Sequence, residues 1–132
     1  MFNFNLVICP THELNLQHWY LMVLEMQQKR ILYIDSINNQ ERGLKIGNLL
    51  KLCIFKAYKE IHEEEMSSID KAKWKIEVVV PSQQSNSYDC GMLTGANAYC
   101  LISELSITTF KTSDMKNLRM QLTNRILENG KK

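Results

Sequence analysis

The sequence predicts a mixed α/β (α+β) domain, in which one small sheet is flanked by helices. Short apolar runs rich in β-branched and aromatic residues predict strands, and longer stretches with helical spacing predict helices. The strands are expected at 4–8, 17–26, 30–35 and 74–80, and the helices at 42–61, 90–104 and 114–128. With 132 residues and a hydrophobic fraction of 45%, the chain suits a single domain with a modest core.

The first part of the chain predicts three strands, two of them in a hairpin. Phe4–Ile8 predicts a short buried strand that ends at Pro10, and Thr11–Leu16 predicts a loop. Gln17–Met26 and Arg30–Asp35 are separated by a short polar connection, which favours an antiparallel hairpin.

The second half of the chain alternates helices with one further strand. Ser67–Lys73 predicts a polar connection, and the continuous Val78-Val79-Val80 run predicts a strand buried on both faces. Ser113 is a candidate N-cap for the last helix. An apolar face of that helix is predicted from Met115, Leu118, Met120, Leu122, Ile126 and Leu127.

Charge and cysteine usage exclude several classes of function. The formal net charge is +2 and the basic residues are scattered, so nucleic-acid binding is not indicated. No apolar run reaches the roughly 20 residues of a membrane span, and no signal peptide is evident. Four widely spaced cysteines favour a reducing, intracellular compartment. Cys9 and His12 lack a second pair of ligands at similar spacing, so we expect neither metal nor cofactor.

The segment Pro81–Gly91 holds the candidate nucleophile. This segment is a polar loop that follows the predicted strand 74–80. It ends at Cys90 and Gly91, after which apolar residues recur at helical spacing. Unpaired N–H groups and the dipole at a helix start stabilise a thiolate, which is the reactive form of cysteine. The alternative is a buried structural cysteine, a common fate for this residue type.

Candidate partners for this thiol lie in the hairpin and the loop. His18 begins one strand and Asp35 ends the next, so antiparallel pairing places both at one sheet edge, where a carboxylate can orient an imidazole. Gln84, six residues before Cys90, could donate a hydrogen bond to a developing oxyanion. The alternatives are a packed histidine, a turn-starting aspartate and an ordinary loop amide, with Asp89 as a helix cap.

Taken together, these residues resemble the C-terminal catalytic region of the ubiquitin-like-protein-specific cysteine proteases. These are SUMO-deconjugating enzymes related to the adenovirus protease. The resemblance lies in His18–Leu21, Tyr33–Ser36, Gln84–Gly91 and Asp114–Arg119, and it spans about Val7 to Leu127.

The resemblance implies a papain-like, adenain-like core and a role for each matching residue. Cys90 would be the nucleophile, His18 the general base and acid, Asp35 the orienting carboxylate, and Gln84 an oxyanion donor beside the Cys90 N–H. Trp19 would line a narrow channel for a Gly-Gly tail. The implied partners are a SUMO-like modifier and its protein conjugates, for a monomeric enzyme in the nucleus or cytoplasm.

Two departures from the family pattern leave other functions open. Ser87 stands where the family usually has glycine, and the family's N-terminal segment, with a second channel tryptophan that Trp74 does not replace, is expected to be absent. A catalytically degenerate module that binds a modifier or another protein is therefore an alternative. An acyltransferase built on the same triad is a third hypothesis.

Overall fold

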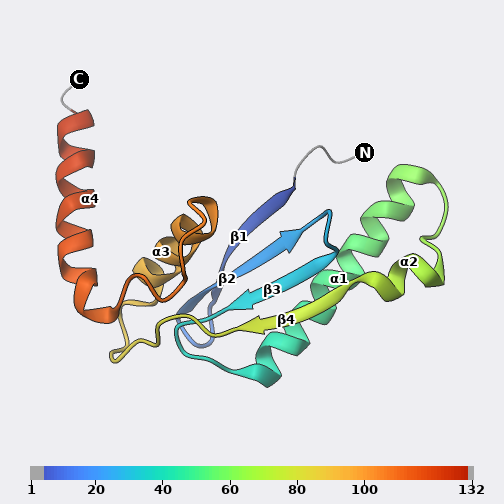
Figure 1. Ribbon diagram of the computed structural model, residues 1–132, viewed down its shortest axis with the longest axis horizontal. Coiled ribbons are helices and arrows are strands. Elements are labelled where there is room, and N and C mark those ends of the chain that lie inside the picture. Colours follow the sequence, from blue (N-terminus) through green and yellow to red (C-terminus); the bar gives the residue numbers. More distant parts are fainter. Residues whose placement is uncertain (1–4, 131–132) are drawn as a thin grey trace.

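A four-stranded sheet is the centre of the computed structural model, which describes residues 5–130. The strand order is β1-β2-β3-β4, with β1, β2 and β3 antiparallel and β4 parallel to β3 (Figure 1). The strands are β1 (Leu6–Glu13), β2 (His18–Glu25), β3 (Arg30–Ile34) and β4 (Lys75–Val79). The helices are α1 (Gln40–His62), α2 (Ser68–Lys73), α3 (Cys90–Ile102), the 3-10 turn η1 (Thr112–Asp114) and α4 (Met115–Gly130). The mixed α/β fold class and the β2–β3 hairpin are thus confirmed.

Each face of the sheet has its own core, because side chains alternate along a strand. One face carries Tyr20, Met22, Leu24, Ile31 and Tyr33, and α1 covers it with Ile46, Leu50, Ile54, Phe55 and Tyr58. The other face carries Leu21, Val23, Leu32 and Ile34, and Ala98 and Leu101 of α3 pack there with Ile107. The two central strands are therefore buried on both sides.

Strand β1 is longer and more exposed than the sequence predicts. The expected end at Pro10 and loop from Thr11 are wrong, because β1 continues to Glu13 and Pro10 pairs with Leu21. Proline is tolerated because β1 is an edge strand, where a missing N–H leaves no neighbouring strand unpaired. The part of the expected strand at Phe4 lies outside the described residues.

Strand β4 is the other edge of the sheet, so the predicted burial on both faces is wrong. Val78 and Val79 are partly buried, and Val80 is 53% exposed. An edge strand has a neighbour on one side only, which the run of valines does not reveal.

The helices also differ from expectation in two places. The predicted connection Ser67–Lys73 contains α2, with Ser67 as its N-cap. Ser113 is not the cap of the last helix: the Lys111 N–H donates to the Asp114 carboxylate at 2.8 Å, and α4 begins at Met115.

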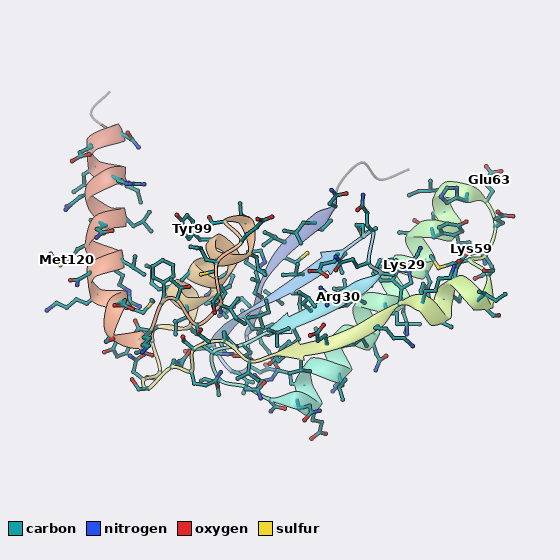
Figure 2. The ribbon with its side chains drawn as sticks, in the orientation of Figure 1. Lys29, Arg30, Lys59, Glu63, Tyr99 and Met120 are labelled. Atoms are coloured by element: carbon teal, nitrogen blue, oxygen red, sulfur yellow. The ribbon has the colours of Figure 1, made fainter. Side chains whose placement is uncertain are left out.

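Helix α4 stands away from the rest of the molecule, so its predicted apolar face is largely uncovered (Figure 1). Met115 is fully buried and Leu118 is partly buried, whereas the helix from Met120 onward is exposed. Lys59 and Glu63, near the C-terminal end of α1, lie at the opposite end of the molecule from Met120 (Figure 2). Among residues 5–130, no helix combines the length and apolar character needed to cross a bilayer.

We expect Gly43→Ala to lower the free energy of unfolding by about 1–3 kcal/mol through overpacking. A Cβ at residue 43 would lie 2.5 Å from Cδ1 of Tyr33, whose ring is fully buried and cannot move aside freely. Urea denaturation measures the change. Gly95→Ala in α3 is the matched control: it meets nothing within 4 Å and should leave stability equal or raise it by roughly 0.5–1 kcal/mol. Equal stability of Gly43→Ala and wild type would contradict the close packing of α1 on β3.

Candidate active site

A histidine and an aspartate meet at the end of the β2–β3 hairpin. Leu21 pairs with Ile34 in the ladder, so Asp35 follows the last paired residue of β3 and His18 begins β2. The His18 Nε2 atom lies 2.6 Å from Asp35 Oδ1. The imidazole is 6% exposed and the aspartate 0%, so water competes little for this hydrogen bond.

The Asp35 carboxylate receives hydrogen bonds from three further groups. The Ile37 N–H donates to Oδ1 at 2.8 Å, and the Tyr33 hydroxyl donates to Oδ2. Arg42 on α1 places Nη1 3.2 Å from Oδ2, and its Nε lies 3.6 Å from Glu13 Oε2. A buried carboxylate without such partners would be costly, so these donors make its position tolerable.

Tyr33 is held in its neutral, donating form by the same surroundings. Burial, followed by the hydrogen bond to Asp35 and the charge of that carboxylate, raises the pKa of the Tyr33 phenol well above its usual range. Residues 33 and 35 are two apart on a strand and therefore share a face. This spacing was visible in the sequence, although Tyr33 was not singled out.

Cys90 is the first residue of α3, and it is 5% exposed. Helix α3 packs against β2, and Gly91 faces Trp19: a Cβ at residue 91 would lie 3.5 Å from the indole Cδ1. Gly91 follows Cys90 and Trp19 follows His18, so this contact joins the residues next to the cysteine and the histidine. In the described part of the chain, no hydrogen bond joins the Cys90 thiol to the His18 imidazole.

Gln84 is held by three hydrogen bonds, to Ser36 and Asn86. Its Oε1 accepts from the Ser36 hydroxyl at 2.5 Å, and its backbone N–H donates to the Ser36 carbonyl at 2.8 Å. Its Nε2 donates to the Asn86 carbonyl at 2.5 Å. A side-chain amide has two N–H groups, so one remains for another acceptor.

The loop before Cys90 is held by its own side chains. Asp89 is the N-cap residue of α3, as the alternative in the sequence analysis had it, but its carboxylate makes no capping hydrogen bond. Its Oδ2 instead accepts from Asn86 Nδ2 at 2.6 Å. Gln83 donates to the Asp35 carbonyl at 3.2 Å and accepts the Asn38 N–H at 2.9 Å. Sequence reasoning assigned no role to Asn86 or Gln83, because their contacts depend on how the loop folds.

Trp19 and a groove border the cysteine on the α3 side. The indole is 40% exposed, and its ring centroid lies 4.8 Å from that of His12 on β1. The groove, of about 590 Å³, runs between α3 and α4 from Gly91. No group of three or more histidine, cysteine or acidic residues suited to a metal ion occurs among residues 5–130.

The sheet, the helix opened by a cysteine and the histidine–aspartate pair are the elements of a cysteine-peptidase domain. The profile of the Ulp1 protease family, C-terminal catalytic domain, matches residues 1–132. The chain belongs to this family, as the resemblance in its sequence indicated.

Curated relatives and solved structures agree with this assignment. The chain is 32% identical over 84 residues to ubiquitin-like-specific protease 1 of Saccharomyces cerevisiae, which covers 64% of the chain and 13% of the relative. It is 26% identical over 127 residues to sentrin-specific protease 2 of Rattus norvegicus, covering 96% of the chain and 21% of the relative.

Among solved structures, the fold is similar to that of the SUMO protease Ulp1 with its catalytic cysteine oxidised to a sulfenic acid. The TM-score is 0.73 at 22% identity, over 98% of this chain and 55% of the other. The C-terminal Ulp1 protease domain in complex with Smt3, the yeast ortholog of SUMO, gives a TM-score of 0.66 at 23% identity, over 85% and 47%. The chain thus spans about half of these solved domains and less than a third of the curated relatives above.

Tyr33→Phe is expected to flatten the loss of stability at alkaline pH. The unfolded tyrosine ionises near pH 10, whereas the raised pKa keeps the Tyr33 phenol protonated in the folded state. The stability that this contributes is therefore fully present below about pH 10 and is lost as pH rises further. One retained proton corresponds to a slope of about 1.4 kcal/mol per pH unit.

Urea denaturation of both proteins between pH 8 and 11 measures this difference. Lysine and the other tyrosines titrate in both proteins, so their effects cancel in the comparison. Parallel stability curves for wild type and Tyr33→Phe above pH 10 would contradict the buried Tyr33–Asp35 contact.

Proposed function

We propose that this chain is a cysteine peptidase and isopeptidase that cleaves after the C-terminal Gly-Gly of a SUMO-like modifier. The observation that carries the proposal is the buried His18–Asp35 hydrogen bond. Support for Cys90 as its partner comes from Trp19, the residue after His18, which lies against Gly91, the residue after Cys90. Support for the substrate comes from the relatives, among them a Ulp1 domain in complex with Smt3. The substrates would be the modifier precursor and lysine-linked conjugates.

In this proposal one ring nitrogen of His18 bonds Asp35 and the other accepts the proton of the Cys90 thiol. Nε2–H donates to Asp35 Oδ1, which leaves Nδ1 unprotonated as the acceptor for the Cys90 proton. Catalytic hydrogen bonds often tighten only when substrate binds, so the Sγ–Nδ1 contact would close in the complex. The thiolate then adds to the glycine carbonyl carbon, and His18 passes its proton to the departing lysine amine.

The negative oxygen formed in that step needs donors beside Cys90. The second N–H of Gln84 and the backbone N–H of Cys90, which has no intrahelical acceptor at the first turn, would supply them. Collapse of this adduct leaves a thioester and the free amine. Water, deprotonated by His18, hydrolyses the thioester to a carboxylate and regenerates the thiol.

Trp19 would restrict what reaches the cysteine. Its indole lies over the Gly91 backbone and beside the His12 ring, which narrows the approach along β2. A glycine has no Cβ to meet the indole, so a Gly-Gly tail passes where a larger residue would collide.

A catalytically degenerate module that binds a modifier is a second candidate function. It is favoured by the lack of a described thiol–imidazole hydrogen bond and by the engagement of a Gln84 N–H with the Asn86 carbonyl. Such a module would bind the modifier with unaltered affinity after Cys90→Ala and would form no covalent product.

We expect a SUMO-type modifier carrying a C-terminal Gly-Gly vinyl sulfone to form a covalent adduct with Cys90. The warhead requires a nucleophilic thiol next to the bound glycine tail, so Cys90→Ser should abolish labelling. Intact-protein and peptide mass spectrometry identify the labelled residue. Circular dichroism verifies folding of each sample.

Cys53→Ser is the matched control for this experiment. Cys53 is an exposed cysteine on α1, remote from the α3 start, so its loss should leave labelling unchanged. A folded wild-type chain that binds the modifier but forms no adduct would contradict the peptidase proposal and support the binding module.

A further inference from the structure

Arg119 on α4 makes three contacts with the two residues that precede Cys90. Its Nη1 lies 2.6 Å from Asp89 Oδ1, and its Nη2 donates to the Tyr88 carbonyl at 2.9 Å. The guanidinium carbon also lies 5.5 Å from the centroid of the Tyr88 ring. The Arg119 side chain therefore contacts the backbone carbonyl and the ring of Tyr88 and the carboxylate of Asp89.

These contacts continue through the loop to the Gln84 amide. Asp89 Oδ2 accepts from Asn86 Nδ2 at 2.6 Å, and Asn86 Oδ1 accepts the N–H groups of Tyr88 and Asp89 at 3.0 and 2.9 Å. The Asn86 carbonyl accepts from Gln84 Nε2 at 2.5 Å. A continuous set of hydrogen bonds and one ion pair thus runs from α4 to the side chain proposed to hold the oxyanion.

The Asp89 carboxylate is buried and therefore requires a cation beside it. Its side chain is 5% exposed, and Arg119 is its ion-pair partner among the described residues. A buried carboxylate that loses its cation is driven to rotate toward water. That rotation would remove the Oδ2 acceptor that holds Asn86, and with it the hydrogen bonds of the loop.

Arg119 lies where α4 joins the rest of the molecule, and its side chain contacts the loop before Cys90. The helix contacts the body near Met115, and from Met120 onward it is exposed and stands apart (Figure 1). Arg119 sits at the junction, with a side chain 39% exposed that reaches back to the loop.

We propose that Arg119 is a positioning residue for the proposed reaction: through Asp89 and Asn86 it holds the loop 84–89 so that Gln84 and the start of α3 face the reacting carbonyl. The inference rests on the proposed peptidase function. It assigns no contact between Arg119 and substrate.

The first test measures turnover of a SUMO-type modifier with a fluorogenic C-terminal Gly-Gly amide. Arg119→Ala should lower kcat at least about tenfold, as loss of an oxyanion donor does, while KM stays within about twofold. Arg119→Lys keeps the charge but lacks the planar fork that meets both the Asp89 carboxylate and the Tyr88 carbonyl, so it should recover only part of kcat. Added guanidinium should restore part of the activity of Arg119→Ala.

Two controls separate positioning from a structural effect. Lys116→Ala removes an exposed basic side chain from the same helix, outside the groove lining, and should leave kcat unchanged. Alkylation of Cys90 by iodoacetamide needs no oxyanion donor, so Arg119→Ala should alkylate at the wild-type rate. Unchanged kcat in Arg119→Ala would overturn the proposal; so would a loss of kcat matched by equal loss of alkylation and no rescue by guanidinium.

A second test does not depend on turnover. Hydrogen exchange should show faster exchange of the Tyr88 and Asp89 amides in Arg119→Ala than in wild type and Lys116→Ala, because those amides bond Asn86 Oδ1. If the wild-type chain has no peptidase activity, the proposed function fails, and faster exchange would still assign Arg119 to the loop. Unchanged exchange would overturn that assignment even in an active enzyme.

Discussion

The buried carboxylate of Asp35 is the constraint on which the rest of the site depends. A charge with no exposed surface is tolerated only where donors surround it, and this one receives four. They come from β2, β3, α1 and the turn after β3. Three elements and a turn are therefore fixed around one side chain, and the His18 imidazole is oriented as one of the four donors.

The geometry of this centre follows from ordinary sheet and helix packing. Alternation along β3 puts Tyr33 and Asp35 on the face that α1 covers, and Gly43 lets α1 approach the Tyr33 ring closely. The opposite face belongs to α3, which begins with Cys90 beside Trp19. The site thus lies where the two covering helices reach the same end of the sheet.

Much of this arrangement could be predicted from local sequence rules, and the exceptions have physical causes. The hairpin, the contact between His18 and Asp35, and the helix that opens at Cys90 follow from alternation and spacing. The extension of β1 through Pro10 and the exposure of Val80 could not, because edge strands are defined by their neighbours rather than by their own residues. Arg42 on α1 and Arg119 on α4 reach the carboxylates of Asp35 and Asp89 through contacts between elements, so only tertiary structure reveals them. Whether His18 acts on Cys90 stays a prediction.

The most direct measurement of the central claim, that the His18–Asp35 pair activates the thiol, is the alkylation rate of each cysteine by iodoacetamide at neutral pH. Residue-resolved mass spectrometry gives the rates in wild type and His18→Ala. We predict that Cys90, although buried, reacts faster than exposed Cys53 in wild type, and that His18→Ala slows Cys90 at least about tenfold without affecting Cys53. A Cys90 that reacts more slowly than Cys53 and is indifferent to residue 18 would contradict the account.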